Sequence, residues 1–315
     1  MAAQIPDPLP TGYRLGEYTI DRKIGGGGFS LVYLAFDPAG QPVAIKEYLP
    51  DGMVTRETCG SVKPISEEKE KTFRQGMRYF FDEGRTLANI RHPNVVVVEN
   101  FFRANETVYM VMKYERGKTL QRHIVELRDE PMREGFIRGV FIQLLNGLRE
   151  IHAKRLLHFD IKPSNIYIRH DGSPLLIDFG AARQALLTDQ KYVPMYTPGF
   201  AAPEQYSQRD RLGPWTDIYA VGASMYACIA KHPPPPANER QEEDKMQPAT
   251  KEYAGVYSGA FLELVDSLLR LAYTDRPQSV FSVQKRLIEL MPVHAHQPPI
   301  KLSLLDVIKH KLSKH

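Results

Sequence analysis

Cysteine is scarce in this sequence, and long apolar runs are missing. Its 315 residues include only two cysteines, Cys59 and Cys228. Two cysteines make neither a disulfide framework nor a metal cluster, so we expect reduced, buried thiols in a cytoplasmic protein. The longest mostly apolar run, residues 218–230, is shorter than a membrane span and contains two tyrosines. It indicates a buried helix, and we expect no transmembrane segment in the sequence.

Excess charge is also missing. A net charge of +4 does not by itself indicate a nucleic-acid partner, and we expect none. The first eleven residues are polar and rich in proline, without the apolar core of a secretory signal. The apolar and charged fractions, 43% and 25%, are those of a globular protein with one large domain or two moderate ones.

Hydrophobic patterns divide the chain into a strand-rich first part and a helix-rich second part. Strand patterns occur at residues 17–21, 31–36, 43–46, 95–98 and 108–112, with a long connection at 51–75 and one helix near 80–90. Later patterns predict helices at 136–151, 216–230, 260–271 and 279–290, a hairpin of 166–168 with 175–177, and a proline-rich loop at 231–248. A boundary near residues 113–117 would place a ligand cleft between the two parts.

A dense group of polar residues follows the helix predicted at 136–151. Asp160 can accept a hydroxyl proton, and Lys162 can balance phosphate charge. Asn165 and Asp178 can hold Mg²⁺, at the spacing that a phosphoryl-transfer site requires. Singly, these residues are common in loops, helix caps and β-turns, so the signal lies in their ordered combination.

Two upstream features complete the pattern. The glycine-rich stretch 24–32 is either a flexible turn or a lid whose backbone amides approach phosphates closely. Lys46 ends an apolar strand, where it either reaches solvent or binds phosphate. Glu83 lies on the apolar face of the predicted helix, so it either pairs with Lys46 or extends to solvent, whereas Asp82 would point off that face.

In this order, the motifs resemble those of the protein kinase family over residues 14–291. The strips 46–50, 197–200 and 203–206 are similar to those of bacterial serine/threonine kinases. The resemblance implies an α+β, two-lobed protein kinase fold, with a small β-rich N-lobe that carries one main helix and a larger, mainly α-helical C-lobe. It implies a flexible N-terminal tail (1–13), an N-lobe (14–114), a C-lobe (115–291) and a basic C-terminal tail (292–315).

The resemblance also implies roles for individual residues. Asp160 would be the base, Lys162 would face the transferred phosphoryl group, and Lys46, held by Glu83, would grip the α- and β-phosphates. Asn165 and Asp178 would hold Mg²⁺, with Mn²⁺ as an alternative. The expected ATP-binding set is Ile24, Gly25, Gly26, Gly27, Gly28, Phe29, Ser30, Val32, Ala44, Lys46, Met112 as gatekeeper, and the hinge residues Lys113 and Glu115. Ser30 stands where the family usually has glycine.

Four further residues would organise the C-lobe. Thr197 is expected to bond to both Asp160 and Lys162, in a strip where a protein substrate docks. Glu204 is expected to pair with Arg276. Asp217 is expected to anchor the backbone of the catalytic loop, a role that is compatible with that of a helix N-cap.

Phe159 departs from the family pattern, which usually has arginine there. That arginine grips a phosphate on the activation segment through charge-assisted hydrogen bonds, and phenylalanine cannot. We therefore expect that phosphorylation of residues 181–196 is not the usual on-switch, although Thr188, Tyr192 and Tyr196 are available. A constitutively ordered segment or a regulatory protein partner is expected instead.

The implied function is ATP-dependent phosphorylation of serine or threonine hydroxyls on a protein substrate. Lys162 and Thr197 favour these hydroxyls over that of tyrosine. One alternative is a pseudokinase that acts as an ATP-binding scaffold or regulatory module, which Phe159 alone supports. A small-molecule phosphotransferase is a second, against which the docking strip 197–204 argues. The tail is either a basic amphipathic helix that docks on the kinase, a partner or an anionic surface, or a disordered linker.

Overall fold

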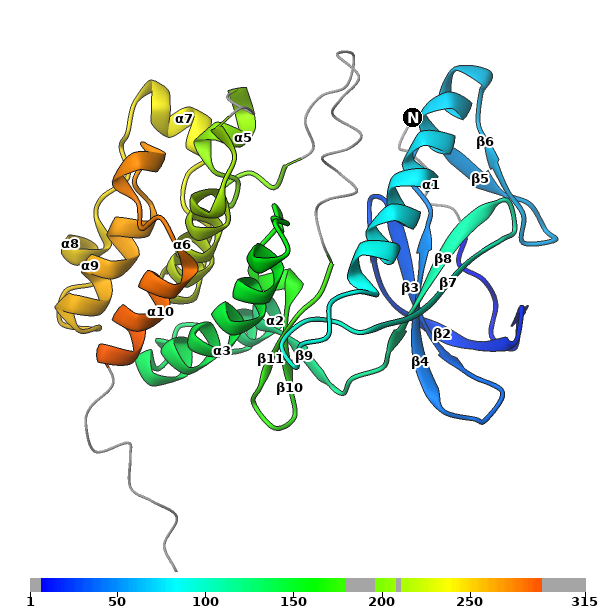
Figure 1. The fold of residues 1–315 in the computed structure, drawn as a ribbon, viewed down its shortest axis with the longest axis horizontal. Coiled ribbons are helices and arrows are strands. Elements are labelled where there is room, and N and C mark those ends of the chain that lie inside the picture. Colours follow the sequence, from blue (N-terminus) through cyan, green and yellow to red (C-terminus); the bar gives the residue numbers. More distant parts are fainter. Residues whose placement is uncertain (1–6, 179–195, 208–210, 291–315) are drawn as a thin grey trace, which may run out of the picture.

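Two lobes lie side by side in the computed structural model, which describes residues 7–178, 196–207 and 211–290. In Figure 1 the strand-rich lobe with helix α1 lies on the right, and the helical lobe lies on the left. The predicted two-lobed α+β fold is thereby confirmed.

The N-lobe is built on antiparallel strands. These are β1 (Arg14–Leu15), β2 (Tyr18–Gly27), β3 (Ser30–Phe36), β4 (Pro42–Tyr48), β5 (Val54–Arg56), β6 (Val62–Pro64), β7 (Val98–Ala104) and β8 (Thr107–Lys113). Six of them form one sheet in the order β1-β2-β3-β4-β8-β7, and β5 pairs with β6 in a separate hairpin. Strand β8 is buried over its first five residues, as its central place between β4 and β7 requires.

Helix α1 (Glu67–Leu87) packs on β4 through aromatic contacts. The ring of Tyr48 lies 5.5 Å from that of Phe73 and 5.7 Å from that of Phe80. A Cβ atom on Gly76 would lie 1.9 Å from the Tyr48 hydroxyl, so only glycine permits this approach. The helix begins with Glu67, Glu68 and Glu70, which favourably face the positive end of its dipole.

The C-lobe is mainly helical. Its helices are α2 (Leu120–Glu126), α3 (Glu134–Ala153), α5 (Pro203–Ser207), α6 (Pro214–Ala230), α7 (Ala237–Glu242), α8 (Ala249–Glu252), α9 (Gly259–Leu268) and α10 (Val280–Glu289), with single 3₁₀ turns η1 (Pro163–Asn165) and η4 (Tyr273–Asp275). A small sheet, β9 (Gly117–Thr119), β10 (Ile166–Arg169) and β11 (Pro174–Leu176), lies beside the connection to the N-lobe. Helix α6 is buried along nearly its whole length, as its apolar sequence predicts. None of the helices among the described residues has the length and apolarity to cross a membrane.

The connection predicted at 51–75 is wrong in its detail. It holds the β5–β6 hairpin, and α1 begins at Glu67, inside the predicted range. Each strand of the hairpin is only three residues long, which is too short for a recognisable alternation of apolar and polar residues. The start of α1 is polar, so it shows no apolar stripe of helical period. Residues 7–13, predicted as tail, also belong to the N-lobe by their contacts: Leu9 is buried, and its amide donates to the Tyr33 hydroxyl.

Three further expectations need correction. Residues 95–97 precede strand β7, and Val95 instead bridges to Leu176 of the C-lobe, so this apolar run serves packing between the lobes. The proline-rich loop contains helix α7, which the buried Arg240 fixes through Asp244 and the carbonyl of Leu269. Cys59 is exposed, whereas Cys228 is buried as expected.

Candidate active site

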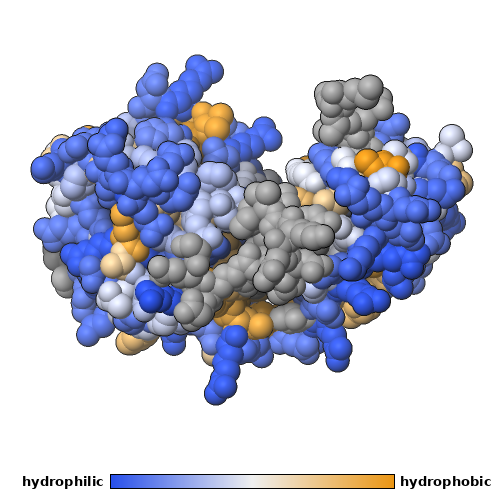
Figure 2. Space-filling model, turned by 90° about the horizontal axis from the view of Figure 1, so that it is seen from above, coloured by the Kyte–Doolittle hydropathy of each residue, from blue (hydrophilic) through white to orange (hydrophobic). Residues whose placement is uncertain are grey.

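A cavity of about 520 Å³ lies between the lobes. Its walls come from the turn between β2 and β3, from β4, α1, the hinge after β8, and the β10–β11 sheet. Every residue that the sequence predicts to bind ATP lines it. Figure 2, seen from above, shows two broad masses with a notch between them at the upper edge of the outline. Tyr167, Leu175 and Ile177, which belong to the hairpin predicted at 166–168 and 175–177, also line the cavity.

Lys46 and Glu83 both point away from solvent. Lys46 is 8% exposed, and its Nζ lies 2.5 Å from Oδ1 of Asp178 and 5.5 Å from the centre of the Phe80 ring. Glu83 is 5% exposed and lines the same cavity. The alternatives in which either side chain reaches solvent are therefore wrong, and a direct contact between Lys46 and Glu83 stays a prediction.

Asp160, Lys162 and Thr197 form a closed triangle of hydrogen bonds. The Thr197 hydroxyl donates to Oδ1 of Asp160 at 2.8 Å and accepts from Nζ of Lys162 at 2.8 Å. The same Nζ lies 2.9 Å from Oδ2 of Asp160. The predicted contacts of Thr197 are present, and they join the catalytic loop to the strip that follows residue 195.

Asn165 and Asp178 supply oxygen atoms at the cavity wall. Nδ2 of Asn165 donates to both the carbonyl and Oδ2 of Asp160, each at 2.9 Å. Because both protons of this amide are used, its oxygen is the atom that Asn165 can offer to a cation. A carboxylate and an amide oxygen are hard ligands of the kind that Mg²⁺ prefers, so the pair fits this metal.

Asp217 fixes the backbone of the catalytic loop from the N-terminus of α6. Its carboxylate accepts from the amides of His158 at 2.9 Å and Phe159 at 2.8 Å, and from Nε2 of His152 at 2.8 Å. Burial acts to raise the pKa of Asp217, but the hydrogen bond and charge of His152 outweigh it, so the pKa lies below its ordinary value. Phe159 adopts a φ of 65°, which is uncommon for a bulky residue and which these bonds stabilise.

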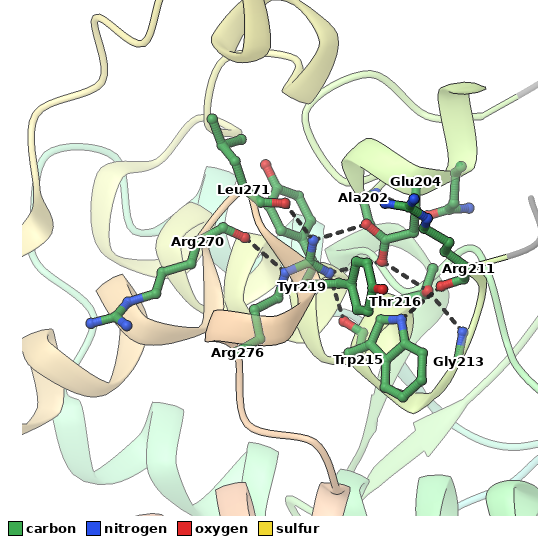
Figure 3. Close-up of polar contacts among 12 residues, drawn as sticks. Ala202, Glu204, Arg211, Gly213, Trp215, Thr216, Tyr219, Arg270, Leu271 and Arg276 are labelled. Atoms are coloured by element: carbon green, nitrogen blue, oxygen red, sulfur yellow. Dashed lines mark hydrogen bonds and ion pairs between the residues drawn. The ribbon is translucent and has the colours of Figure 1, made fainter. Parts of the chain in front are cut away.

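A buried ion pair joins the end of the docking strip to the C-lobe core (Figure 3). Arg276 contacts Glu204 through two hydrogen bonds of 2.9 and 2.8 Å, and neither side chain is more than 2% exposed. The other N–H groups of Arg276 donate to the carbonyls of Arg270, Leu271 and Trp215. The predicted pair is therefore present, with every donor of the guanidinium used.

Sequence reasoning missed Gln205. Its Nε2 donates to the carbonyl of Phe159 at 3.2 Å, and its Oε1 accepts from the amide of Ala202 at 2.9 Å. Gln205 thus joins the docking strip to the catalytic loop beside the departure at Phe159. The only feature of the sequence that pointed to a role for Gln205 was its position directly after Glu204. Of the activation-segment residues named above, Thr188 and Tyr192 lie outside the described residues, and the ring of Tyr196 lies 3.9 Å from that of Tyr206.

Comparisons with known proteins agree with this geometry. A model of the protein kinase domain matches residues 18–288. The human serine/threonine-protein kinase Nek5 is 30% identical over 281 residues, which cover 86% of this chain and 36% of Nek5. The serine/threonine-protein kinase PknA of Nostoc sp. (strain PCC 7120) is 28% identical over 228 residues, covering 69% of this chain and 37% of PknA. This chain therefore spans less than half the length of either relative.

Comparison with solved structures also supports the protein kinase fold. The structure described as the apo form of PpkA-294 is 38% identical, with a TM-score of 0.82, and covers 89% of this chain and 99% of its own. The kinase domain of Mycobacterium tuberculosis PknI, 22% identical with a TM-score of 0.67, covers 90% of this chain and 99% of its own and is alike in fold. The chain therefore belongs to the protein kinase family, among relatives that are serine/threonine kinases.

Proposed function

We propose that this domain transfers the γ-phosphoryl group of ATP to serine or threonine hydroxyls of a protein substrate. The observation that carries the proposal is the triangle of Asp160, Lys162 and Thr197 beside an interlobe cavity lined by Lys46, Asn165 and Asp178. The carboxylate of Asp160, the ammonium group of Lys162 and the expected docking strip thus meet beside the cavity that we assign to the nucleotide. This arrangement suits positioning and charge stabilisation, which supply most of the catalysis in phosphoryl transfer.

Asp160 is the group that orients the substrate hydroxyl and takes its proton. Its Oδ1 is held by Thr197 and its Oδ2 by Asn165, so the carboxylate cannot rotate freely. The incoming hydroxyl therefore meets an acceptor in a fixed direction, which lowers the entropic part of the barrier. Lys162, which contacts the same carboxylate, stabilises negative charge on the transferred group.

Lys46 holds the nucleotide phosphates from the N-lobe side, and the backbone at residues 25–30 covers them. The short contact between Lys46 and Asp178 supports this role, because it places the ammonium group of Lys46 beside a candidate metal ligand in the cavity. Asp178 and Asn165 are the residues that would hold Mg²⁺, or Mn²⁺, and the metal would neutralise phosphate charge when bound. A cytoplasmic location and a regulatory protein partner also stay predictions.

A pseudokinase scaffold is the weaker alternative. Phe159 is the departure that favours it, yet the side chain at this position does not form the hydrogen bonds that hold the catalytic loop. Those bonds come from the backbone amides of His158 and Phe159 to Asp217. With the base, the lysine and both candidate metal ligands in place, we favour catalysis.

Transfer of labelled γ-phosphate from ATP to a generic protein acceptor tests the proposal. Asp160→Asn should lower the rate roughly 10²- to 10⁴-fold, the contribution of a positioned general base. Asp178→Asn replaces a carboxylate ligand by a neutral amide, so it should lower the rate strongly and raise the Mg²⁺ concentration needed for half-maximal activity. Asp171→Asn, in the exposed turn between β10 and β11, is the matched control and should leave the rate unchanged. A wild-type protein that binds ATP but transfers no label, or an Asp160→Asn variant as active as wild type, would refute the proposal.

A further inference from the structure

Strand β4 presents different chemistry on its two faces. Lys46 and Tyr48 line the interlobe cavity, and Tyr48 packs against α1. Because side chains alternate along a strand, Glu47 points to the opposite face. There it has no exposed surface, although a carboxylate is costly to bury unless it is paired and hydrogen-bonded.

The Glu47 carboxylate is fully engaged in a buried polar network. It accepts hydrogen bonds from the hydroxyls of Tyr33 at 2.7 Å and Tyr109 at 2.6 Å, and from Nη2 of Arg56 at 2.6 Å. Burial and the charge of Glu47 together raise the pKa of both tyrosines above the usual range, so each hydroxyl remains a donor. Tyr33 and Tyr109 lie on strands β3 and β8, which flank β4 in the sheet.

Arg56 is the member of this network that does not belong to the sheet. It ends strand β5 of the hairpin, and its side chain is 5% exposed. Its Nη1 donates to the carbonyl of Gly60 at 2.9 Å, across the hairpin turn, and its Nε donates to the carbonyl of Asp7 at 2.7 Å. Arg56 therefore joins the hairpin and the N-terminal segment to the strand that carries Lys46.

The hairpin is joined to two other parts of the candidate site. Directly after β4, the amides of Leu49 and Asp51 donate to the carbonyls of Phe29 and Gly28, at the tip of the glycine-rich turn. Directly before α1, the amide of Ile65 donates to the carbonyl of Met53, and this bond closes the base of the hairpin. The segment between β4 and α1 thus contacts the lid on one side and leads into the helix of Glu83 on the other.

We propose that the buried Arg56–Glu47 pair is a positioning device for the nucleotide site. It ties the β5–β6 hairpin to the back of β4, so that the glycine-rich turn, Lys46 and α1 are held in register around the phosphates. The inference rests on the proposed kinase activity and deepens it by naming the ion pair that holds the phosphate-binding elements of the N-lobe in place.

Steady-state kinetics of Arg56→Met test this inference. Loosening the hairpin should raise KM for ATP roughly tenfold or more, since small displacements of positioning groups have effects of this size, and leave KM for the protein acceptor within about twofold. Lys63→Met removes the cation of an exposed ion pair with Glu57 on the same hairpin and is the matched control. It should leave both constants unchanged.

A double variant separates positioning from stability. Arg56→Met alone leaves a buried, unpaired carboxylate, so its melting temperature should fall. Adding Glu47→Gln removes that charge and should recover much of the melting temperature, because the amide can accept from one tyrosine hydroxyl through Oε1 and donate to the other through Nε2. KM for ATP should stay raised, since the hairpin remains untied. If KM for ATP returns to the wild-type value together with the melting temperature, or never rises in Arg56→Met, the positioning role is refuted. A wild-type protein that transfers no phosphate would instead refute the proposed function.

Discussion

Thr197→Val is the substitution that most directly probes the geometry of the candidate site. The hydroxyl of Thr197 connects the strip 197–204, where we expect a protein substrate to dock, to both Asp160 and Lys162, with two hydrogen bonds of 2.8 Å. Valine has nearly the shape of threonine and lacks the hydroxyl. Lys162 keeps its direct contact of 2.9 Å with Asp160, so the change removes the connection and leaves both catalytic groups present.

The size of the effect follows from these two bonds. Each is partly buried and contributes about 1–1.5 kcal/mol to holding Asp160 in place. If both act in the transition state, the barrier rises by about 2–3 kcal/mol, which is roughly a 30- to 150-fold loss in kcat/KM for the protein acceptor. Thr197 does not line the nucleotide cavity, so KM for ATP should change by less than about twofold.

The assay is phosphate transfer to a protein acceptor, measured at varied acceptor and at varied ATP. Thr197→Ser is the matched control, since it keeps the hydroxyl and loses only a methyl group. It should retain activity within about threefold of wild type. Thermal melting of all three proteins excludes unfolding as the cause. A valine variant as active as the serine variant would show that the triangle has no catalytic role.

Two further predictions concern stability. Arg276→Lys keeps the charge but has fewer donors, so it should lower the free energy of unfolding by about 2–4 kcal/mol, measured by urea denaturation. The exposed pair of Arg74 with Glu70 provides the control, because Arg74→Lys should cost less than about 0.5 kcal/mol, and equal losses would contradict the buried network. Burial lowers the pKa of His158 below its ordinary 6.5, so the unfolded chain binds more protons than the folded one, and stability falls as the pH drops below about 6.5. This loss, up to about 1.4 kcal/mol per pH unit, should be absent in His158→Phe, and identical pH profiles for the two proteins would contradict it.

The candidate site could be predicted from sequence largely because its residues occur in short motifs of fixed spacing. The glycine-rich stretch spans the end of β2 and the turn after it, Lys46 lies within β4, and Asp178 follows β11. Each is next to a clear apolar pattern, and all three meet at one cavity. The hairpin β5–β6 could not be predicted in this way. Its strands are too short for periodicity, and its stability comes from Arg56 contacting Glu47, a tertiary contact with no local signature.

Gln205 was missed for a related reason. Its two hydrogen bonds link the carbonyl of Phe159 with the amide of Ala202, and backbone groups carry no sequence signal. The pairing of Glu204 with Arg276 could be predicted only from the resemblance to the protein kinase family. The two residues are far apart in the sequence, so no local pattern indicates that they are in contact. Motifs therefore identified the residues that line the cavity, whereas the supporting contacts of Arg56 and Gln205 required the structure.

Phe159 combines a side chain that departs from the family pattern with a main chain that is held by hydrogen bonds. The backbone at this position, with its φ of 65°, is held by Asp217 from one side and by Gln205 from the other. Both contacts are to main-chain atoms, so they are indifferent to the side chain. Phenylalanine in place of the family's usual arginine is therefore expected to remove a phosphate ligand, while the main-chain bonds that hold the loop of Asp160 stay in place. We therefore expect that catalysis does not require phosphorylation of the activation segment, because the main-chain bonds that hold the loop do not depend on the side chain at residue 159.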